Sequence, residues 1–272
     1  MKQIDLKSLH SAVIAVMVTC SVMTIGCAAK YVTPGAAVNL QAISDYGIKE
    51  RFETKAASPF PARIAVARVQ EVGYHSYTTR GHGRGRYSVV TARDVEQDTD
   101  IEKLSSLAQV GGLATLNRLL LPETLQSVKD LRLACASLHA DMLLLYTFDT
   151  SFRIKGQDLG PLTVVTLGFL PNKKAFVTTT ASAVLYDVRT GHVYGVAEAS
   201  NTTDHLASTW SKEQVIDNAR LETEKEAFAK LVDQFAQMWE SLLAEYAEAA
   251  NTQQNAPGAS GPEATQAGTP QQ

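Results

Sequence analysis

The chain has 272 residues, of which 45% are hydrophobic and 19% charged, and its formal net charge is −3. A chain of this length can hold one large domain or two small ones, and this hydrophobic fraction is that of an ordinary globular protein. A mildly acidic chain with 7% aromatic residues lacks the positive charge and the stacking side chains typical of nucleic-acid binding, so no nucleic-acid partner is expected.

Residues 1–27 are predicted to be a targeting segment. Lys2 and Lys7 make the start weakly basic, and an uncharged run follows from Ser11 to Ala29. A basic start followed by an apolar run is typical of a secretory signal peptide. Because the run is about 18–19 residues long, just enough to span a bilayer, an uncleaved membrane anchor stays open as an alternative, as does an ordinary signal peptide.

The run ends in Thr24-Ile25-Gly26-Cys27, which resembles the lipobox of bacterial lipoproteins, with Thr24 where that motif usually has leucine. The resemblance implies that the signal peptide is removed before Cys27 and that its thiol carries the lipid. Acyl chains such as palmitate would then anchor the chain in the bilayer. Ala28 follows the cysteine, and a residue other than aspartate there points to the outer membrane in enterobacterial lipoproteins. We therefore expect a lipid-anchored protein of the bacterial cell envelope that faces the periplasm.

The cysteines fit this interpretation. Cys20 would leave with the signal peptide and Cys27 would be acylated, so Cys135 alone would remain and could form no internal disulfide. Cys135 lies on the apolar stripe of a predicted helix, where we expect a small core residue rather than a nucleophile. The sequence contains no CxxC motif, and we expect neither a cofactor nor a metal.

Behind the signal peptide the sequence divides into three further parts. Residues 28–61 have weak hydrophobic periodicity and two Pro-containing turn signals, which indicates a linker or a loosely docked arm. Residues 62–250 are predicted to form a single domain. Residues 251–272 are rich in Gln, Pro, Gly, Ala, Ser and Thr, so we expect a disordered tail that cannot bury enough apolar surface to fold.

The domain is predicted to be α/β (α+β), with a mixed or antiparallel sheet of about five to six strands and helices packed on it. The stretch from Asp141 to Glu198 organises it, because apolar or β-branched segments alternate there with turn signals. Asp187-Val-Arg-Thr-Gly191 has the composition of a hairpin turn with a bulge. Strands are expected over residues 63–69, 87–91, 141–149, 162–170, 176–188 and 192–202.

Helices are predicted on either side of the central strands. Ile101–Val110 is expected to be helical, Gly111–Leu121 is ambiguous between helix and loop, and Pro122 is suited to the first turn of a helix that reaches Leu138. A long C-terminal helix is predicted over Ser211–Ala249, since a capping box opens it and an apolar stripe follows. We expect this stripe to pack on the sheet, while a homo-oligomer seam stays open.

The segment Tyr74–Arg86 has the most unusual composition in the chain. Arg80, Arg84 and Arg86 alternate there with glycines. Glycines free the backbone, and guanidinium groups can bind phosphate or carboxylate with two hydrogen bonds. We weigh an anion-binding or partner-binding loop against a mobile, solvated hairpin tip. The glycine spacing does not fit a nucleotide-binding loop.

Two possible metal sites have only weak support in the sequence. His75 and His82 would supply two ligands with no third nearby. From Asp94 to Glu102 every second residue is acidic, as in a calcium loop, but Thr99 replaces the glycine and Ser105 the closing glutamate. We expect these acids to complement the dipole of the helix that follows.

Three segments carry a resemblance to a known group of proteins: Arg63–Gln70, Leu138–Leu145 and Ala183–Gly191. Together with the lipobox, they resemble a group of poorly characterised bacterial envelope lipoproteins. Their domain is similar to those of the curli-secretion lipoprotein and of the amino-terminal part of the Tol periplasmic protein. The resemblance implies a fold more than a role, because roles in such proteins include pore formation, activation of cell-wall enzymes and assembly scaffolding.

The sequence therefore predicts a lipid-anchored interaction or scaffolding module without chemistry of its own. Its partners would be the lipid bilayer, through the acylated amino terminus, and an unidentified envelope protein. The alternative is an envelope hydrolase that uses a carboxylate with His75, His82 or His192, although no GxSxG or HExxH motif supports it.

Overall fold

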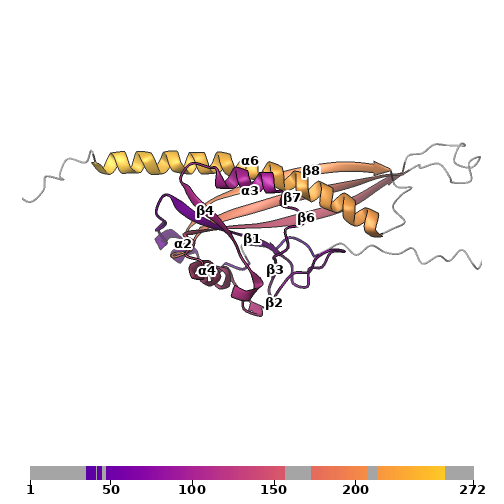
Figure 1. Cartoon of the computed structure of the whole chain (residues 1–272), viewed down its shortest axis with the longest axis horizontal. Helices are drawn as coiled ribbons and strands as arrows, with labels where there is room; N and C mark the ends of the chain where they lie inside the picture. The colour runs from indigo at the N-terminus through magenta and orange to yellow at the C-terminus, as the bar shows by residue number, and fades with distance from the viewer. Residues whose placement is uncertain (1–34, 41, 45–46, 157–172, 207–212, 255–272) are drawn as a thin grey trace, which may run out of the picture.

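The computed structural model describes residues 35–40, 42–44, 47–156, 173–206 and 213–254. They form a six-stranded mixed sheet with helices on both faces, and a long C-terminal helix crosses one of these faces (Figure 1). The predicted fold class is confirmed. The strands are β1 (Ala62–Gln70), β2 (Arg84–Gly85), β3 (Ser88–Val90), β4 (Val110–Thr115), β5 (Thr124–Leu125), β6 (Met142–Gly156), β7 (Lys173–Asp187) and β8 (Val193–Leu206).

The helices are α2 (Ile48–Glu53), α3 (Asp98–Ser105), α4 (Val128–Ser137) and α6 (Glu213–Gln254), with a 3-10 turn, η1, at Arg118–Leu120. The main sheet has the order β3-β1-β6-β7-β8, and β4 also pairs with β1. β1 runs parallel to β4 and β6, whereas β6, β7 and β8 are successive antiparallel neighbours. The two-residue strands β2 and β5 pair separately.

The long antiparallel ribbon of β6, β7 and β8 confirms the predicted central strands. Beside the turn that follows Asp187, the β7–β8 ladder shifts register between Leu185 and Tyr186, and Gly191 in the turn has a φ of 77°. This is the hairpin with a bulge that the sequence predicted, and glycine meets the need for a positive φ. The strand expected at residues 162–170 lies outside the described residues.

Two cores flank the sheet because side chains alternate between its faces. On one face Ile64 and Leu144 pack against Phe228 and Trp239 of α6. On the other face Leu143 and its neighbours pack against α4, where Cys135 is fully buried. The expected core position of Cys135 is confirmed.

Between α3 and α4 the prediction was wrong in three places. α3 ends at Ser105, and the chain then enters β4, which the sequence left ambiguous between helix and loop. Pro122 does not begin a helix, because α4 starts at Val128 behind a capping box formed by Ser127 and Asp130. β4 is a strand because it forms backbone hydrogen bonds with β1. Local periodicity does not reveal a pairing partner that is distant in the sequence, so this strand was not predicted.

The expected linker is packed on the domain over part of its described length. Val38 and Ile43 are buried in the core beside α4, with exposed fractions of 8% and 2%. Phe60 meets the ring of Trp239 edge to face, with 5.7 Å between the ring centroids. α2 lies between these contacts and buries none of its residues. Packing therefore begins well before residue 62.

Candidate functional site

The loop between β1 and β3, which we call the Arg–Gly loop (residues 74–86), is fastened to the domain at several points. Tyr74 and Tyr87 are buried at its two ends. Ser76 N donates to Thr79 O at 2.8 Å, and His82 exchanges two backbone hydrogen bonds with Val89 at 2.7 and 2.8 Å. β2 then pairs with β5. The loop is thus folded back on the domain, which differs from the mobile, solvated tip that we weighed.

Steric constraints explain why glycine occupies two positions of this loop. Gly83 and Gly85 have φ values of 99° and 108°, in the left-handed half of φ that disfavours other residues. A Cβ atom on Gly85 would lie 2.3 Å from the carbonyl oxygen of Leu125, and one on Gly83 would lie 2.4 Å from Leu125 Cδ1. Close approach to β5 therefore requires the glycines, a role that the sequence analysis did not assign.

The three arginines of the Arg–Gly loop are exposed to solvent. Arg80, Arg84 and Arg86 are exposed, while the glycines lie toward the domain. Within the part of the chain that the structure describes, no ion pair joins any of the three to a carboxylate. Three solvated guanidinium groups are thus presented on a backbone that hydrogen bonds hold in place.

A buried ionic cluster lies beneath the loop, between the sheet and α6. Arg68 of β1 contacts Asp94 at 2.8 Å and Glu224 of α6 at 3.4 Å, and it donates to the hydroxyl of Tyr74 at 2.9 Å. Arg220 shares Glu224 and also contacts Asp217 at 3.0 Å. Burial alone would lower the pKa of Arg68, but Tyr74 and the surrounding carboxylates raise it overall, so it stays charged.

This cluster connects α6 to the sheet, and sequence reasoning missed it. Arg68 interrupts the apolar run from Ile64 to Val69. Asp217, Arg220 and Glu224 recur at helical spacing on the face that continues into Phe228. Such spacing within a buried stripe was the available signal. The Arg68 guanidinium also lies over the ring of Phe148, with 4.8 Å to the centroid.

A second buried polar group lies at the hairpin turn. Asp187 has no exposed surface, and its carboxylate accepts hydrogen bonds from the backbone of Arg189 and Thr190. It also accepts from Ala57 N, the Ser58 hydroxyl and the Tyr194 hydroxyl, each at 2.8 Å. Burial alone would raise the pKa of Asp187, but these bonds outweigh it and lower the pKa to about 2. The group serves to fasten residues 57–58 to the hairpin.

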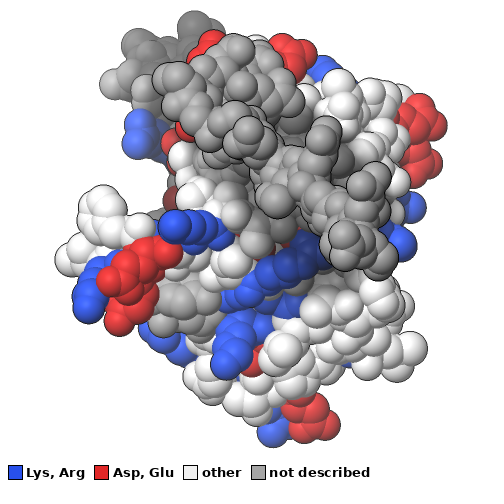
Figure 2. Space-filling model, turned by 90° about the vertical axis from the view of Figure 1, so that its left-hand side faces the viewer, with Lys and Arg blue, Asp and Glu red and all other residues white. Residues whose placement is uncertain are grey.

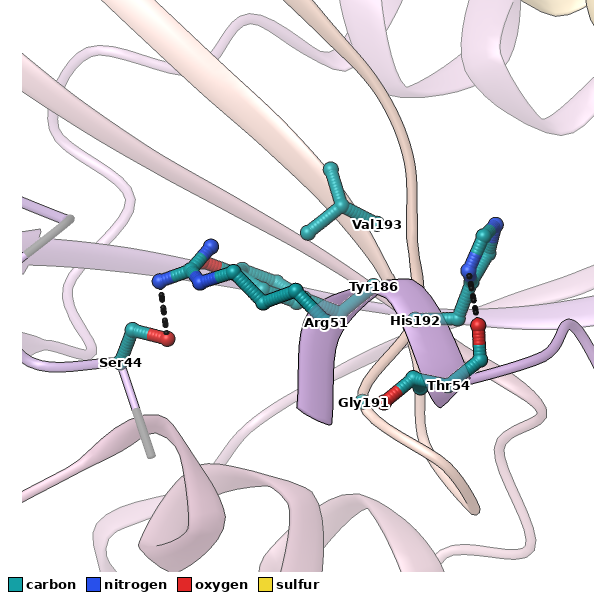
Figure 3. A pocket seen from close by; sticks show the side chains of 7 residues that line it. All are labelled: Ser44, Arg51, Thr54, Tyr186, Gly191, His192 and Val193. Carbon is teal, nitrogen blue, oxygen red and sulfur yellow. Dashed lines mark hydrogen bonds between the residues drawn. The ribbon is translucent and has the colours of Figure 1, made fainter. Parts of the chain in front are cut away.

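A cavity of about 130 Å³ lies between α2 and the same hairpin (Figure 3). Inside it Arg51 donates to the Ser44 hydroxyl at 2.7 Å, and His192 Nδ1 lies 3.2 Å from the carbonyl oxygen of Thr54. Figure 3 shows that these two side chains point to opposite sides. The cavity is lined by Ser44, Arg51, Thr54, Tyr186, Gly191, His192 and Val193.

Figure 2 shows the end of the molecule at which α2 and the hairpin turn lie, and Lys and Arg side chains gather there in a band. Some cations at this end have structural partners. Arg189 contacts Asp141 at 2.8 Å, and Arg132 donates to the carbonyl oxygens of Val188 and Arg189 at 3.0 and 2.8 Å.

The three histidines considered for a hydrolase lie in separate places. His75 Nδ1 lies 3.2 Å from Gly73 O on the exposed side of the Arg–Gly loop, and His82 Nε2 is buried without a hydrogen-bond partner. His192 packs edge to face on Tyr194, with 5.2 Å between the ring centroids. The structure brings none of these three described imidazoles together with another.

The acidic side chains from Asp94 to Asp100 have different partners and do not converge on one site. Asp94 pairs with Arg68, and Glu96 accepts the hydroxyl of Tyr146. Asp98 and Asp100 occupy the first turn of α3, as expected for acids that complement the helix dipole. Among the described residues, no group of three or more His, Cys, Asp or Glu side chains is placed to hold a metal ion.

Cys27 lies outside the described residues, so its predicted acylation stays a prediction. Within the described ranges, no helix combines the length and the apolar character needed to cross a bilayer.

The chain matches no protein-family model, and a comparison with curated proteins finds no match either. Among solved structures it is similar to protein XCC0632 from Xanthomonas campestris, of family DUF330, with a TM-score of 0.33 and 10% identity over 76% of this chain and 97% of that one. A hypothetical protein, CT253 from Chlamydia trachomatis, has a TM-score of 0.27 and 10% identity over 66% and 96%. At these TM-scores nothing about function is transferred from either protein.

Proposed function

We propose that this chain is a lipid-anchored, non-catalytic interaction module of the bacterial envelope, held by acyl chains on Cys27. The observation that carries the proposal is Gly26-Cys27 at the end of an uncharged run, in a segment with a basic start. Acyl chains on the new amino terminus give stable membrane binding, whereas one chain alone binds reversibly. Ala28 after the cysteine, by resemblance to enterobacterial lipoproteins, supports the periplasmic side of the outer membrane as the location.

The proposal of a non-catalytic role is supported by the state of the polar groups in the domain. General acid–base catalysis needs a titratable group within hydrogen-bond reach of a substrate. The Asp187 carboxylate accepts bonds from its own chain, and the Glu224 carboxylate pairs with Arg68 and Arg220. The exposed arginines of the Arg–Gly loop are better suited to binding an anionic partner than to proton transfer, since guanidinium groups stay protonated.

The experiment that tests this proposal is labelling of bacterial cells with an alkyne-tagged palmitate. The wild-type chain and the Cys20→Ser variant should incorporate the label, because Cys20 is removed with the signal peptide. The Cys27→Ser variant should not. Label in the Cys27→Ser chain, or none in the wild type, would contradict acylation at this position. Crosslinking in the same cells, followed by mass spectrometry, would then name the envelope protein that the module contacts.

A further inference from the structure

The chain that arrives from Cys27 meets the domain beside the Arg–Gly loop. A Cβ atom on Gly35, the first described residue, would lie 3.2 Å from Glu71 Cβ and 3.5 Å from Tyr74 Cα. The next residue, Ala36, donates to the Glu71 carboxylate at 3.2 Å and accepts from Glu71 N at 3.0 Å. The amino-terminal chain therefore joins the domain at the base of this loop.

The length of the connection limits the distance between the loop and the proposed anchor. From Cys27 to Gly35 there are eight residue steps, and a fully extended chain spans at most about 3.3–3.6 Å per residue. Cys27 therefore lies within about 29 Å of Gly35, whatever path the connection takes. If Cys27 is held at a membrane surface, the Arg–Gly loop is kept close to the same surface. The tether thus gives the loop a high effective concentration of lipid headgroups.

The loop presents the side chains that a phospholipid surface attracts. Arg80, Arg84 and Arg86 are exposed, and planar guanidinium groups bind phosphate oxygens with two hydrogen bonds. Beside them Tyr77 is 66% exposed and Val72 is 47% exposed. Tyrosine is favoured at the level of lipid headgroups, where its ring meets the apolar boundary and its hydroxyl meets water.

Two of the nearby carboxylates have other partners. Glu71 accepts a hydrogen bond from Ala36, and Asp94 forms an ion pair with the buried Arg68. The backbone hydrogen bonds to β3 and β5 also fix the loop before any contact is made. A surface that is already ordered loses less conformational entropy when it binds.

We propose that the Arg–Gly loop docks on the phospholipid headgroups of the bilayer that holds Cys27, with Arg80, Arg84 and Arg86 on the lipid phosphates and Tyr77 at the interface. This inference rests on the proposed function, because acylation of Cys27 is what brings the loop to the membrane. The domain is then oriented on the bilayer rather than suspended from a free tether.

The test uses the acylated full chain, reconstituted into vesicles of equimolar phosphatidylglycerol and phosphatidylcholine or of phosphatidylcholine alone. A nitroxide label is attached to the Tyr77→Cys variant. The native Cys135 should stay unlabelled, because it is fully buried and burial raises the pKa of its thiol to about 12. The measurement is the collision rate of the label with a water-soluble relaxing agent and with a lipid-soluble one.

On the anionic vesicles the Tyr77→Cys label should lose access to the water-soluble agent several-fold and gain access to the lipid-soluble one. Neutral vesicles should show a much smaller change. A matched label in the Leu133→Cys variant should stay in water on both, since Leu133 is 61% exposed on α4 and has no place in the proposed contact.

Two further variants separate charge from folding. Replacing Arg80, Arg84 and Arg86 with serine should abolish the shielding of the Tyr77→Cys label, whereas replacing all three with lysine should keep most of it. Both sets should retain the thermal midpoint, because the three side chains are exposed. Shielding that survives in the serine set, or that is lost in the lysine set while the midpoint is unchanged, would contradict the proposal.

The outcomes distinguish this inference from the proposed function. If the protein floats with the vesicles but the Tyr77→Cys label stays in water on phosphatidylglycerol, the inference is wrong and the anchor stands. In that case, loss of a crosslinked envelope protein in the serine variant would assign the loop to an acidic protein surface. A chain that floats with neither vesicle overturns the proposed function and the inference with it.

Discussion

At the scale of single residues, Asp187 is a buried carboxylate whose pKa is lowered by the hydrogen bonds that it accepts. Its buried carboxylate closes the hairpin turn through two backbone amides and holds residues 57–58 through three further hydrogen bonds. Hydrogen bonds donated to a carboxylate favour its anionic form. Folding is therefore coupled to the ionisation of Asp187.

The first prediction concerns the Asp187→Asn variant. The pKa of Asp187 is about 2 in the folded chain and about 3.9 in an unfolded one, a difference worth roughly 2–3 kcal/mol of unfolding free energy. Because the folded pKa is the lower one, this stability is present above about pH 4 and is lost as the pH falls toward 2. At neutral pH the variant should lose about that amount, since an amide group would face donors with its own N–H.

Urea unfolding at a series of pH values measures this effect. The difference in unfolding free energy between wild type and Asp187→Asn should be largest at pH 7. It should decrease as the pH falls from about 4 to about 2. Asp149→Asn is the matched control, because Asp149 is an exposed carboxylate on the same sheet. A gap that stays constant across this window would show that ionisation of Asp187 does not contribute.

At the scale of elements, α6 packs on the sheet through two successive stretches of one buried face. Its first half carries the buried ionic cluster with Arg68, and its second half carries an apolar stripe. Trp239 is fully buried in this stripe, with Phe60 at 5.7 Å and Phe235 at 6.1 Å between ring centroids. Its indole N–H donates to Ala108 O at 2.7 Å.

The second prediction follows from this packing. Trp239→Ala should lower the free energy of unfolding by roughly 3–5 kcal/mol, because it removes a large buried side chain and leaves a cavity. Glu240→Ala changes the neighbouring exposed residue and should cost less than about 0.5 kcal/mol. Denaturant unfolding gives both values. A small loss for Trp239→Ala, accompanied by a change of oligomeric state on a sizing column, would instead place this stripe at a subunit interface.

The elements that the sequence predicted well are those whose signal is local. β6, β7 and β8 were found because β-branched and apolar runs are bounded by turn residues, and α6 because its stripe keeps helical spacing over many turns. β4 was missed because its partner, β1, is distant in sequence and two glycines hide its periodicity.

The arginines of the Arg–Gly loop could be named in advance. The fixed backbone beneath them could not, since it depends on β5 and on the two buried tyrosines.

The same contrast applies to Asp187. Its place in a turn follows from its own neighbours in the sequence, but its bonds to Ser58 and Tyr194 follow only from the fold. Arg68 likewise looks like a lone polar residue in the apolar run from Ile64 to Val69, and only the fold places Glu224 of α6 beside it.

At the scale of the whole molecule, the proposed account joins three parts. Cys27 supplies the anchor, residues 35–61 lead to the domain and pack on it in part, and the Arg–Gly loop stands at the entry point of the chain. Because the domain begins so soon after the anchor, it would be held at the membrane surface rather than far from it. Each part of this account depends on where the mature chain begins.

The most direct test is therefore the intact mass of the protein purified from detergent-solubilised bacterial membranes. The account predicts a chain that begins at Cys27 and carries the additional mass of a diacylglycerol group and an amide-linked acyl chain, with Cys20→Ser giving the same mature mass. A chain that still begins at Met1 would support the uncleaved membrane anchor. A chain that begins at another residue without acyl mass would indicate an ordinary signal peptide, and either result would contradict the account.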